Sequence, residues 1–593
     1  MTGEYSMSHN IDEIRRKAEA GDAEAQDKLG DMYRLGNGID QNYEEALKWY
    51  KASEAQGNIS ARNHIGVMYH YGYGVPKDTG KAGQIYRECI AAGEYKACNN
   101  LAILYDTGDG VEKNRKKALE LYLEAAEHGI WQGMDNAARF YYKGDVVERD
   151  LDKAEELLVK AAKYGSTNML TQFAEISYSG DEEFRDYARA FRLYSKAAEY
   201  GDESALGNLG LLYYEGIGVE KSYEKAVEIF NSIINDPEIS EETKAYSYAN
   251  LACAYQDGHG VPKDTVKAGE LYIKAANGGC SKMYERLGEM YATGKIFEKS
   301  LENSFEWYMK AAELGYPAAQ AKVGDAYRMS KGVERDYDNA RIWYEKSAAQ
   351  GDPAGQNGLG NLYLCGHGVE KDYGKAFELY SLAAGQGYPA SVSNLGLLYR
   401  DGKGVKKDPG KAFEYFRQAA DKGNETAMFH LASMYFDGLY VKRDDAKALE
   451  LFKKAAEKGH SGAMEKLGYM YGIGIYVERD LSEAARWYAK AAELGDANAQ
   501  GNLGGLYLFG DGVEQNIEKA CELIRKSADR GNATGQYYLG CMYEYGYGVP
   551  RDMKTAKMWF KQAEKNGNTG AGEHLADFHF VAKSLIDRFK KGR

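Results

Sequence analysis

Pairs of glycines separated by one residue recur along the chain, and glycine-rich loops are one of the structures with which proteins bind phosphate groups. Gly36 and Gly38 form the first pair, and Gly546 and Gly548 form the last. A phosphate-binding loop needs the pattern G-x-x-x-x-G-K-[ST] after a strand, because its backbone amides and lysine must surround the phosphates. No pair matches that pattern. The glycine pairs therefore predict turns.

A second candidate for chemistry is the run Ser222-Tyr-Glu-Lys225, which matches the S-x-x-K motif of penicillin-recognising serine enzymes. Those enzymes also need S-D-N and K-T-G motifs, and neither accompanies this run. The ten histidines form no H-E-x-x-H pair and no Cys/His cluster with metal-ligand spacing. We therefore predict no catalytic residues, no metal site and no cofactor.

Charge and hydropathy limit the class of protein. The 593 residues carry a formal net charge of −13 and include no basic domain, which argues against nucleic-acid binding. The N-terminus lacks the apolar stretch of a secretory signal, and no segment is apolar enough for a membrane helix. Seven scattered cysteines, an odd number, indicate reduced thiols. These features predict a cytoplasmic protein without a membrane span and leave its oligomeric state open.

An internal repeat accounts for most of the sequence. An apolar or small residue recurs every 36 residues, and we take it as the reference position of each repeat. The spacing changes once, to 42 residues, between Leu209 and Leu251. Such a period predicts a solenoid whose units pack mainly against their neighbours. The reference positions are Leu29, Ile65, Leu101, Ala137, Phe173, Leu209, Leu251, Leu287, Val323, Leu359, Leu395, Leu431, Leu467, Leu503, Leu539 and Leu575.

The residues around each reference position predict a first helix, helix A. The next residue is always Gly or Ala, which allows another helix to approach closely. Tyr follows four residues after the reference position, except at Ser177 and His579. Residues four apart lie on one side of a helix, so each Leu–Tyr pair predicts a buried stripe.

A turn and a second helix, helix B, follow in every repeat. Seven residues after the reference position lies Gly, or Ser330 in one repeat, as expected where the chain needs a positive φ. The second Gly of the turn is missing at Val146, Tyr440 and Tyr476, among others, where we expect a different loop path. Thirteen residues after the reference position, all fifteen repeats carry Asn, Asp or Ser, the preferred N-cap residues. Helix B then carries Ala and, four residues later, an aromatic or aliphatic residue such as Tyr380.

The two ends and the one irregular step depart from this pattern. We predict an N-terminal tail and capping helix over residues 1–21, the solenoid over 22–567, and a C-terminal capping helix with a basic tail over 568–593. The six extra residues of the long step lie in an irregular connection at 235–244. That connection is either a tolerated surface insertion, since loop length costs little entropy, or a bend in the solenoid.

The repeat resembles a known family. Residues 391–423 and 499–531 closely follow A-x-x-x-L-G-x-x-Y-x-x-G-x-G-V-x-x-D-x-x-K-A-x-x-x-Y-x-K-A-A-x-x-G, which is similar to the Sel1-like repeat, a relative of the tetratricopeptide repeats. The resemblance covers essentially the whole chain. It implies an all-α fold, a right-handed α/α superhelical solenoid of about fifteen 36-residue antiparallel helix pairs.

The resemblance also implies a function, because family members usually act as adaptors that assemble protein complexes. We expect a non-catalytic scaffold that binds a protein or peptide partner on the concave face of the solenoid. One alternative is a small-ligand or β-lactam-binding, enzyme-like member, an activity ascribed to a cysteine-rich subfamily. Here only Cys89 and Cys98 come near the cysteine pattern of that subfamily, one residue off its spacing. A further alternative is a structural, self-assembling repeat protein.

Candidate binding residues come from an analogy with tetratricopeptide grooves. It places residues five before, two before, two after and five after the reference position on the concave side. The last of these columns holds Tyr142, Tyr178 and Tyr214 in consecutive repeats, and aromatic and Arg side chains are the usual anchors of interfaces. These tyrosines either form a ladder that grips an extended or helical peptide or pack against the neighbouring helix. The other candidates in this column are Arg34, Arg328, Arg400 and Phe436.

Overall fold

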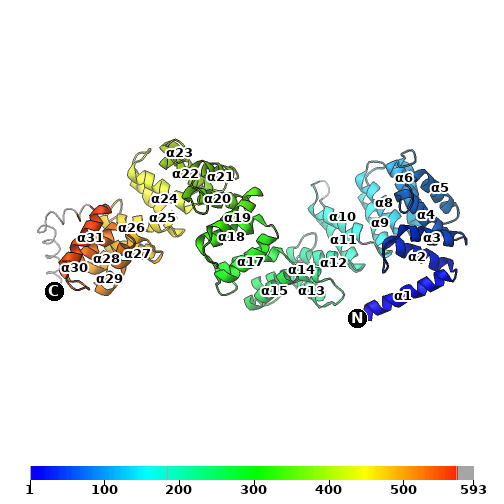
Figure 1. Cartoon of the computed structure of the whole chain (residues 1–593), viewed down its shortest axis with the longest axis horizontal. Coiled ribbons are helices and arrows are strands. Elements are labelled where there is room, and N and C mark those ends of the chain that lie inside the picture. The colour runs from blue at the N-terminus through cyan, green and yellow to red at the C-terminus, as the bar shows by residue number, and fades with distance from the viewer. Residues whose placement is uncertain (1, 183–184, 569–570, 572–593) are drawn as a thin grey trace. The chain divides into compact units, whose positions relative to one another are not determined.

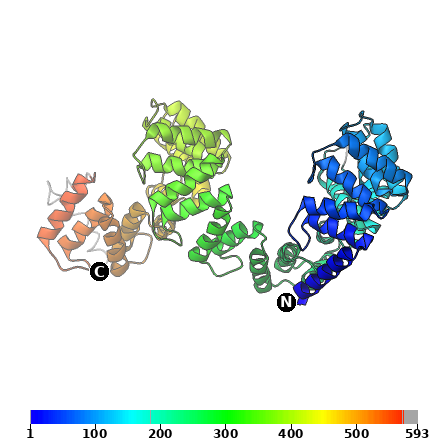
Figure 2. The same cartoon turned by 45° about the vertical axis from the view of Figure 1, so that its right-hand side comes forward.

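The computed structural model describes residues 2–182, 185–568 and 571, and within these ranges the chain forms 31 α-helices and no strand (Figure 1). The chain divides into two compact units, residues 1–287 with 294–298 and residues 288–293 with 299–593. Within each unit, consecutive helices pack beside one another, and Figure 2 shows the same chain in a turned view. The predicted all-α solenoid of fifteen helix pairs is confirmed.

Helix α1 (Thr2–Glu19) precedes the pairs, and each pair consists of an even-numbered helix A and an odd-numbered helix B. The A helices are α2 (Ala23–Leu35), α4 (Ile59–Tyr71), α6 (Lys96–Thr107), α8 (Trp131–Lys143), α10 (Asn168–Ser179), α12 (Glu203–Glu215), α14 (Glu241–Asp257), α16 (Lys282–Thr293), α18 (Pro317–Met329), α20 (Pro353–Cys365), α22 (Pro389–Asp401), α24 (Glu425–Asp437), α26 (Ser461–Ile473), α28 (Ala497–Phe509) and α30 (Ala533–Tyr545). The B helices are α3 (Tyr43–Glu54), α5 (Thr79–Ala91), α7 (Arg115–Glu127), α9 (Leu151–Lys163), α11 (Tyr187–Glu199), α13 (Tyr223–Asn235), α15 (Thr265–Asn277), α17 (Leu301–Glu313), α19 (Tyr337–Ala349), α21 (Tyr373–Gly385), α23 (Pro409–Asp421), α25 (Asp445–Glu457), α27 (Leu481–Glu493), α29 (Ile517–Asp529) and α31 (Met553–Lys565).

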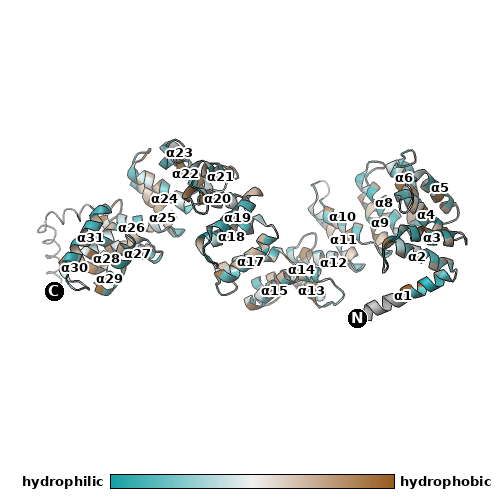
Figure 3. Ribbon diagram, in the orientation of Figure 1, coloured by the Kyte–Doolittle hydropathy of each residue, from teal (hydrophilic) through white to brown (hydrophobic). Residues whose placement is uncertain are grey.

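Helices A and B of a repeat meet where a glycine of helix A faces a ring of helix B. Tyr380 is fully buried against Gly360, and a methyl group added to Gly360 would lie 2.7 Å from that ring. Gly324 and Tyr344 repeat the arrangement at the same 2.7 Å. The small residue after each reference position therefore permits the close approach that the sequence predicted. Figure 3 shows apolar and polar residues on most helices, as expected when one side is buried.

The prediction that each Leu–Tyr pair forms a fully buried stripe is wrong for the tyrosine, which is only half-buried. Tyr69 and Tyr399 keep one side of the ring accessible, whereas Leu395 is 2% exposed. Lysines of the following helix B cover the accessible side: Lys81 Nζ lies 4.0 Å from the ring centroid of Tyr69. The buried stripe of helix A is therefore completed by the ring of helix B and not by this tyrosine.

The predicted N-caps are confirmed in all fifteen B helices. The side chain of each cap accepts a hydrogen bond from a backbone N–H in the first turn, as Asp372 does from Lys375 at 2.9 Å. The backbone N–H of the same cap donates to the carbonyl of the residue four after the reference position, as Asp372 does to Tyr363 at 3.0 Å and Asp186 does to Ser177 at 2.9 Å. Each turn is therefore tied to both of the helices that it joins.

The turns without a second glycine fall into two groups. Tyr440 and Tyr476 keep the positive φ of the glycines that they replace, at 68° and 57°, so the expectation of a different path is wrong there. Val146 does not adopt a positive φ, and its turn does differ. Ser330, in place of the first glycine, also adopts a positive φ of 56°.

The N-terminal helix caps the solenoid. Ala18 of α1 is buried together with Ala25 and Leu29 of α2, so α1 covers the first repeat. The predicted C-terminal capping helix and basic tail lie almost entirely outside the described residues.

The glycine–ring contact predicts a measurable loss of stability. Gly360→Ala should lower the free energy of unfolding by about 1–3 kcal/mol, because the added methyl group overlaps the ring of Tyr380. The control is Gly385→Ala at the end of α21, where a methyl group meets no atom within 4 Å. Urea denaturation followed by circular dichroism compares the two, and equal stability would contradict the close-approach interpretation.

Candidate functional site

The six extra residues of the long step are divided between a connection and a helix. α13 ends at Asn235 and α14 has 17 residues, whereas the other A helices have 12 or 13. Glu203 of α12 anchors the connection: its Oε2 accepts hydrogen bonds from the backbone N–H of Ser240 (3.0 Å), the Ser240 hydroxyl (2.8 Å) and the Thr243 hydroxyl (3.3 Å). The insertion therefore lengthens helix A at its N-terminal end and is held by the preceding repeat.

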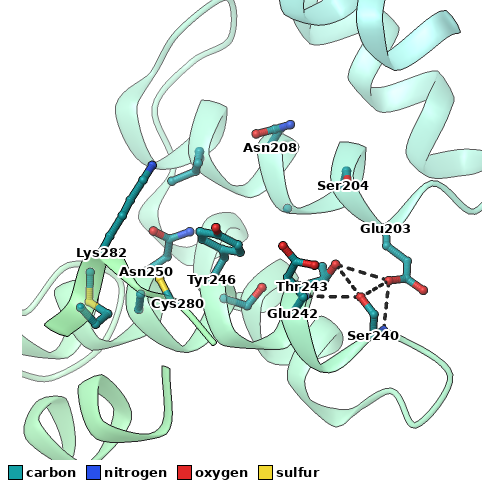
Figure 4. A pocket seen from close by; sticks show the side chains of 15 residues that line it. Glu203, Ser204, Asn208, Ser240, Glu242, Thr243, Tyr246, Asn250, Cys280 and Lys282 are labelled. Carbon is teal, nitrogen blue, oxygen red and sulfur yellow. Dashed lines mark hydrogen bonds between the residues drawn. The ribbon is translucent and has the colours of Figure 1, made fainter. Parts of the chain in front are cut away.

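A hollow of about 670 Å³ lies beside this longer helix, between α12, α14 and the first residues of α16 (Figure 4). Gly207 and Ala249, each two residues before a reference position, leave room because they carry little or no side chain. A methyl group at Gly207 would meet no atom within 4 Å. Leu211 lines the hollow and is half-buried, whereas Leu251 is 1% exposed. The packing between repeats is thus incomplete at the surface of these A helices.

Asparagines one residue before the reference position connect neighbouring repeats elsewhere in the chain. Nδ2 of Asn100 donates to Oδ1 of Asn63 at 3.0 Å, and Nδ2 of Asn136 donates to Oδ1 of Asn99 at 2.9 Å. Asn394 and Asn357 form the same bond in the second unit at 3.0 Å. In each case the acceptor lies two residues before the reference position of the preceding repeat.

Asn208 and Asn250 occupy the donor position in the hollow but make no such bond. The acceptor position facing Asn250 is Gly207, which has no side chain. The acceptor position facing Asn208 is Thr171, whose hydroxyl donates to Asp202 at 2.9 Å. Within the described part of the chain, neither amide side chain has a hydrogen-bond partner, although both line the hollow.

The hollow has a mixed polar and apolar lining, with opposite charges at its two ends (Figure 4). Glu203 and Glu242 lie toward one end and Lys282 toward the other. The backbone N–H and hydroxyl of Ser240 lower the pKa of Glu203, so this carboxylate is charged at neutral pH. Glu242 and Lys282 are exposed and form no ion pair with any residue that the structure describes. Tyr246, 44% exposed, lies between the two ends.

The predicted tyrosine ladder is half-buried and packed. Tyr142 lies edge-on to Phe173 of the next A helix, with ring centroids 4.5 Å apart. Tyr178 lies edge-on to the ring of Tyr187 at 6.0 Å. The Tyr214 hydroxyl is 3.0 Å from His259 Nδ1, and burial raises the pKa of Tyr214 to about 12. These contacts favour the packing alternative.

The predicted arginines make contacts inside the repeats. Arg34 donates to the hydroxyl of Tyr50 (3.0 Å) and to Asp31 (2.9 Å). Arg328 donates to the hydroxyl of Tyr344 and to Asp325, both at 3.1 Å. Arg400 donates to Asp401 at 2.7 Å. The ring of Phe436 lies 5.4 Å from the guanidinium of Arg443. These side chains therefore already contact other residues of the same chain.

The hollow is lined by residues from three of the four positions that the groove analogy places on the concave side. The fourth position, five residues after the reference position, supplied the candidate binding residues and does not line the hollow. Ser204, Tyr246 and Lys282 lie five residues before their reference positions. Gly207 and Ala249 lie two before. The sequence signal that could have found this site is the single 42-residue step, since the hollow lies beside the inserted residues.

Family models identify the repeat. The Sel1 repeat matches fifteen times, at residues 23–58, 59–93, 96–130, 131–166, 174–202, 204–233, 245–280, 281–316, 317–352, 353–388, 389–424, 426–460, 461–496, 497–532 and 533–568. The chain belongs to the Sel1 repeat family. The segment that forms the connection before α14 falls between two matches, so it is an addition to the Sel1 repeat.

Solved structures of similar proteins include other Sel1 repeat proteins. A protective antigen of uropathogenic Escherichia coli with this repeat fold is 25% identical over 98% of this chain and 92% of its own, with a TM-score of 0.30. A Sel1 repeat protein from Oxalobacter formigenes is 34% identical over 41% of this chain and 99% of its own, with a TM-score of 0.37. No curated protein matches the sequence. Because these TM-scores are low, the family assignment rests on the repeat matches.

Other reactive groups of this Sel1 repeat chain are dispersed or buried. The seven cysteines form no disulfide, and burial raises the pKa of Cys89 and of Cys98 to about 12. The described residues include no group of three or more His, Cys, Asp or Glu that could hold a metal ion. None of the helices that could be examined combines the length and apolar character of a membrane span.

Asp135 is a buried carboxyl in the acceptor column of the Sel1 repeats. Its Oδ2 accepts a hydrogen bond from Ser166 at 2.7 Å, while the buried Oδ1 has no partner in the described chain. Burial raises the pKa of Asp135 to about 6, above its ordinary value of 3.8. The folded state therefore binds this proton more tightly than the unfolded chain does, and stability falls as the pH rises from about 4 to about 6.

Asp135→Asn should remove this pH dependence. At pH 8 the variant should gain up to ~2 kcal/mol in the free energy of unfolding, because no charge is buried. At pH 4.5, where the native carboxyl is mostly protonated, the gain should largely disappear. Urea denaturation at the two pH values measures the difference, and an equal effect at both would contradict a buried charge.

Proposed function

We propose that this Sel1 repeat protein is a non-catalytic scaffold that holds a polypeptide segment of a partner in the hollow of α12, α14 and α16. The observation that carries the proposal is the pair of asparagine side chains, Asn208 and Asn250, that line the hollow and have no hydrogen-bond partner in the described chain. In three other repeats the asparagine at this position, Asn100, Asn136 or Asn394, joins the repeat to the preceding one. Polar groups left unpaired at a hollow of ligand size are what a binding site provides.

A polypeptide fits this hollow better than a reaction substrate does. Cys280 is the candidate nucleophile within it, and burial raises the pKa of this thiol, which keeps it protonated and unreactive. No histidine lines the hollow to act as a base. Ser222, of the S-x-x-K run, caps α13 by accepting from the Lys225 N–H at 3.3 Å. We therefore propose a binding role and, with reduced cysteines, a cytoplasmic location.

Filling the hollow should abolish partner binding. Gly207→Leu should fold normally, because its side chain enters open space and leucine favours helix more than glycine. Proteins captured by the tagged full chain from its native host, identified by mass spectrometry, should lose a specific subset with this variant. The matched control Gly385→Leu makes the same change at another open position. Identical captured proteins with both variants would argue against the hollow as the binding site.

The tyrosine ladder remains a second proposed contact surface, because Tyr142, Tyr178 and Tyr214 keep part of each ring exposed in consecutive repeats. Changing all three to Ala should weaken partner capture if the ladder binds a peptide. If the three rings only pack, the melting temperature should fall by several degrees and capture at low temperature should persist. Melting and capture measured on the same preparation separate the two roles.

A further inference from the structure

We propose that the hollow binds an extended peptide segment by its main chain, through Asn208 and Asn250, and selects segments that carry an acidic and a basic side chain facing Lys282 and Glu242. This inference rests on the proposed function and names the chemistry of the partner. A main-chain amide presents one donor and one acceptor, and an asparagine side chain offers both in return. Two such side chains, one repeat apart, match two peptide groups of one extended strand.

The asparagine pair is available because of the residues around it. Where Asn100 and Asn136 bond the preceding repeat, the acceptor column carries Asn63 and Asn99, which are buried. At Gly207 that column is empty, so the surface is open where the bond would form. An unpaired amide on a helix surface binds water in the free protein, and a peptide can replace that water without disrupting any bond within the solenoid.

An extended chain can use both asparagines. Packed helices lie about 9 Å apart, and main-chain groups on one edge of an extended strand recur every two residues, about 7 Å, so the flexible side chains of Asn208 and Asn250 can each reach one. A helical ligand rises only about 1.5 Å per residue and keeps its own main-chain groups paired, so it would leave Asn208 and Asn250 unused. The hollow therefore favours an extended segment over a helix.

The charges at the two ends give the segment its sequence preference. Glu241 is paired with Lys244 at 3.0 Å, but the neighbouring Glu242 and the distant Lys282 have no counterion in the described chain. Exposed charges without partners are available to a ligand, and an interface in which they meet like charges loses affinity. A segment with a basic residue near α14 and an acidic residue near α16 satisfies both.

Panning a phage-displayed library of random 12-residue peptides against the immobilised full chain tests the inference. Wild-type protein should enrich peptides that contain both a basic and an acidic residue, and Gly207→Leu should not retain them. Asn208→Ala with Asn250→Ala should weaken binding of the enriched peptides about ten-fold or more. This double variant should melt like wild type, because neither amide supports the fold. Glu242→Lys with Lys282→Glu should enrich peptides in which the two charges are exchanged.

The outcomes separate this inference from the proposed function. If Gly207→Leu retains the enriched peptides, or wild type enriches none, the hollow is not a polypeptide site and both proposals fail. If the peptides require the hollow but bind the asparagine double variant within two-fold of wild type, the main-chain inference is overturned and the scaffold proposal stands. Retention of the same peptides by the charge-exchanged variant overturns the charge preference.

Discussion

The repeats depend on the contact between a residue with little or no side chain on helix A and a large apolar side chain on helix B, which is a ring in most repeats and Leu158 or Ile524 in two. Because Gly360 has no Cβ, Tyr380 can lie directly on the backbone of α20 and become fully buried. The ring then fills the space between the helices, while the N-cap of helix B and the turn glycines fix the angle at which the chain returns. A fold made in this way draws its stability from neighbouring elements and tolerates variation on its outer surface.

Regular packing also determines where a binding site can form. A repeat that fits its neighbours satisfies its own polar groups: Asn100 bonds Asn63, and Asn136 bonds Asn99. The insertion before α14 adds a helical turn beside the hollow, and the glycine at position 207 lacks the side chain that would accept the bond of Asn250. The result is a hollow with two unpaired asparagines, beside the insertion and at Gly207, in a solenoid that is otherwise regular.

The positions that look most reactive in the sequence have structural roles. The glycine pairs provide positive φ in the turns, Ser222 caps a helix, and Arg34 and Arg328 bond the hydroxyls of buried tyrosines. The tyrosines at 142, 178 and 214 also contact residues of neighbouring elements, and their part-exposed rings remain a proposed contact surface. The reason is repetition: a residue type that recurs at the same position of every repeat serves first of all the packing or the turn that every repeat needs.

The amino-acid sequence by itself determined the fold class, the fifteen helix pairs and their caps, because these follow from local chemistry that repeats every 36 residues. It also placed the six extra residues between Leu209 and Leu251. Only the tertiary structure decided which tyrosines are buried, since burial depends on the ring that the next helix contributes. It also decided that Asn208 and Asn250 are unpaired while Asn100 and Asn136 are not. The partner of each asparagine lies 37 residues or more away, and whether that position carries a side chain in reach is a property of packing between repeats.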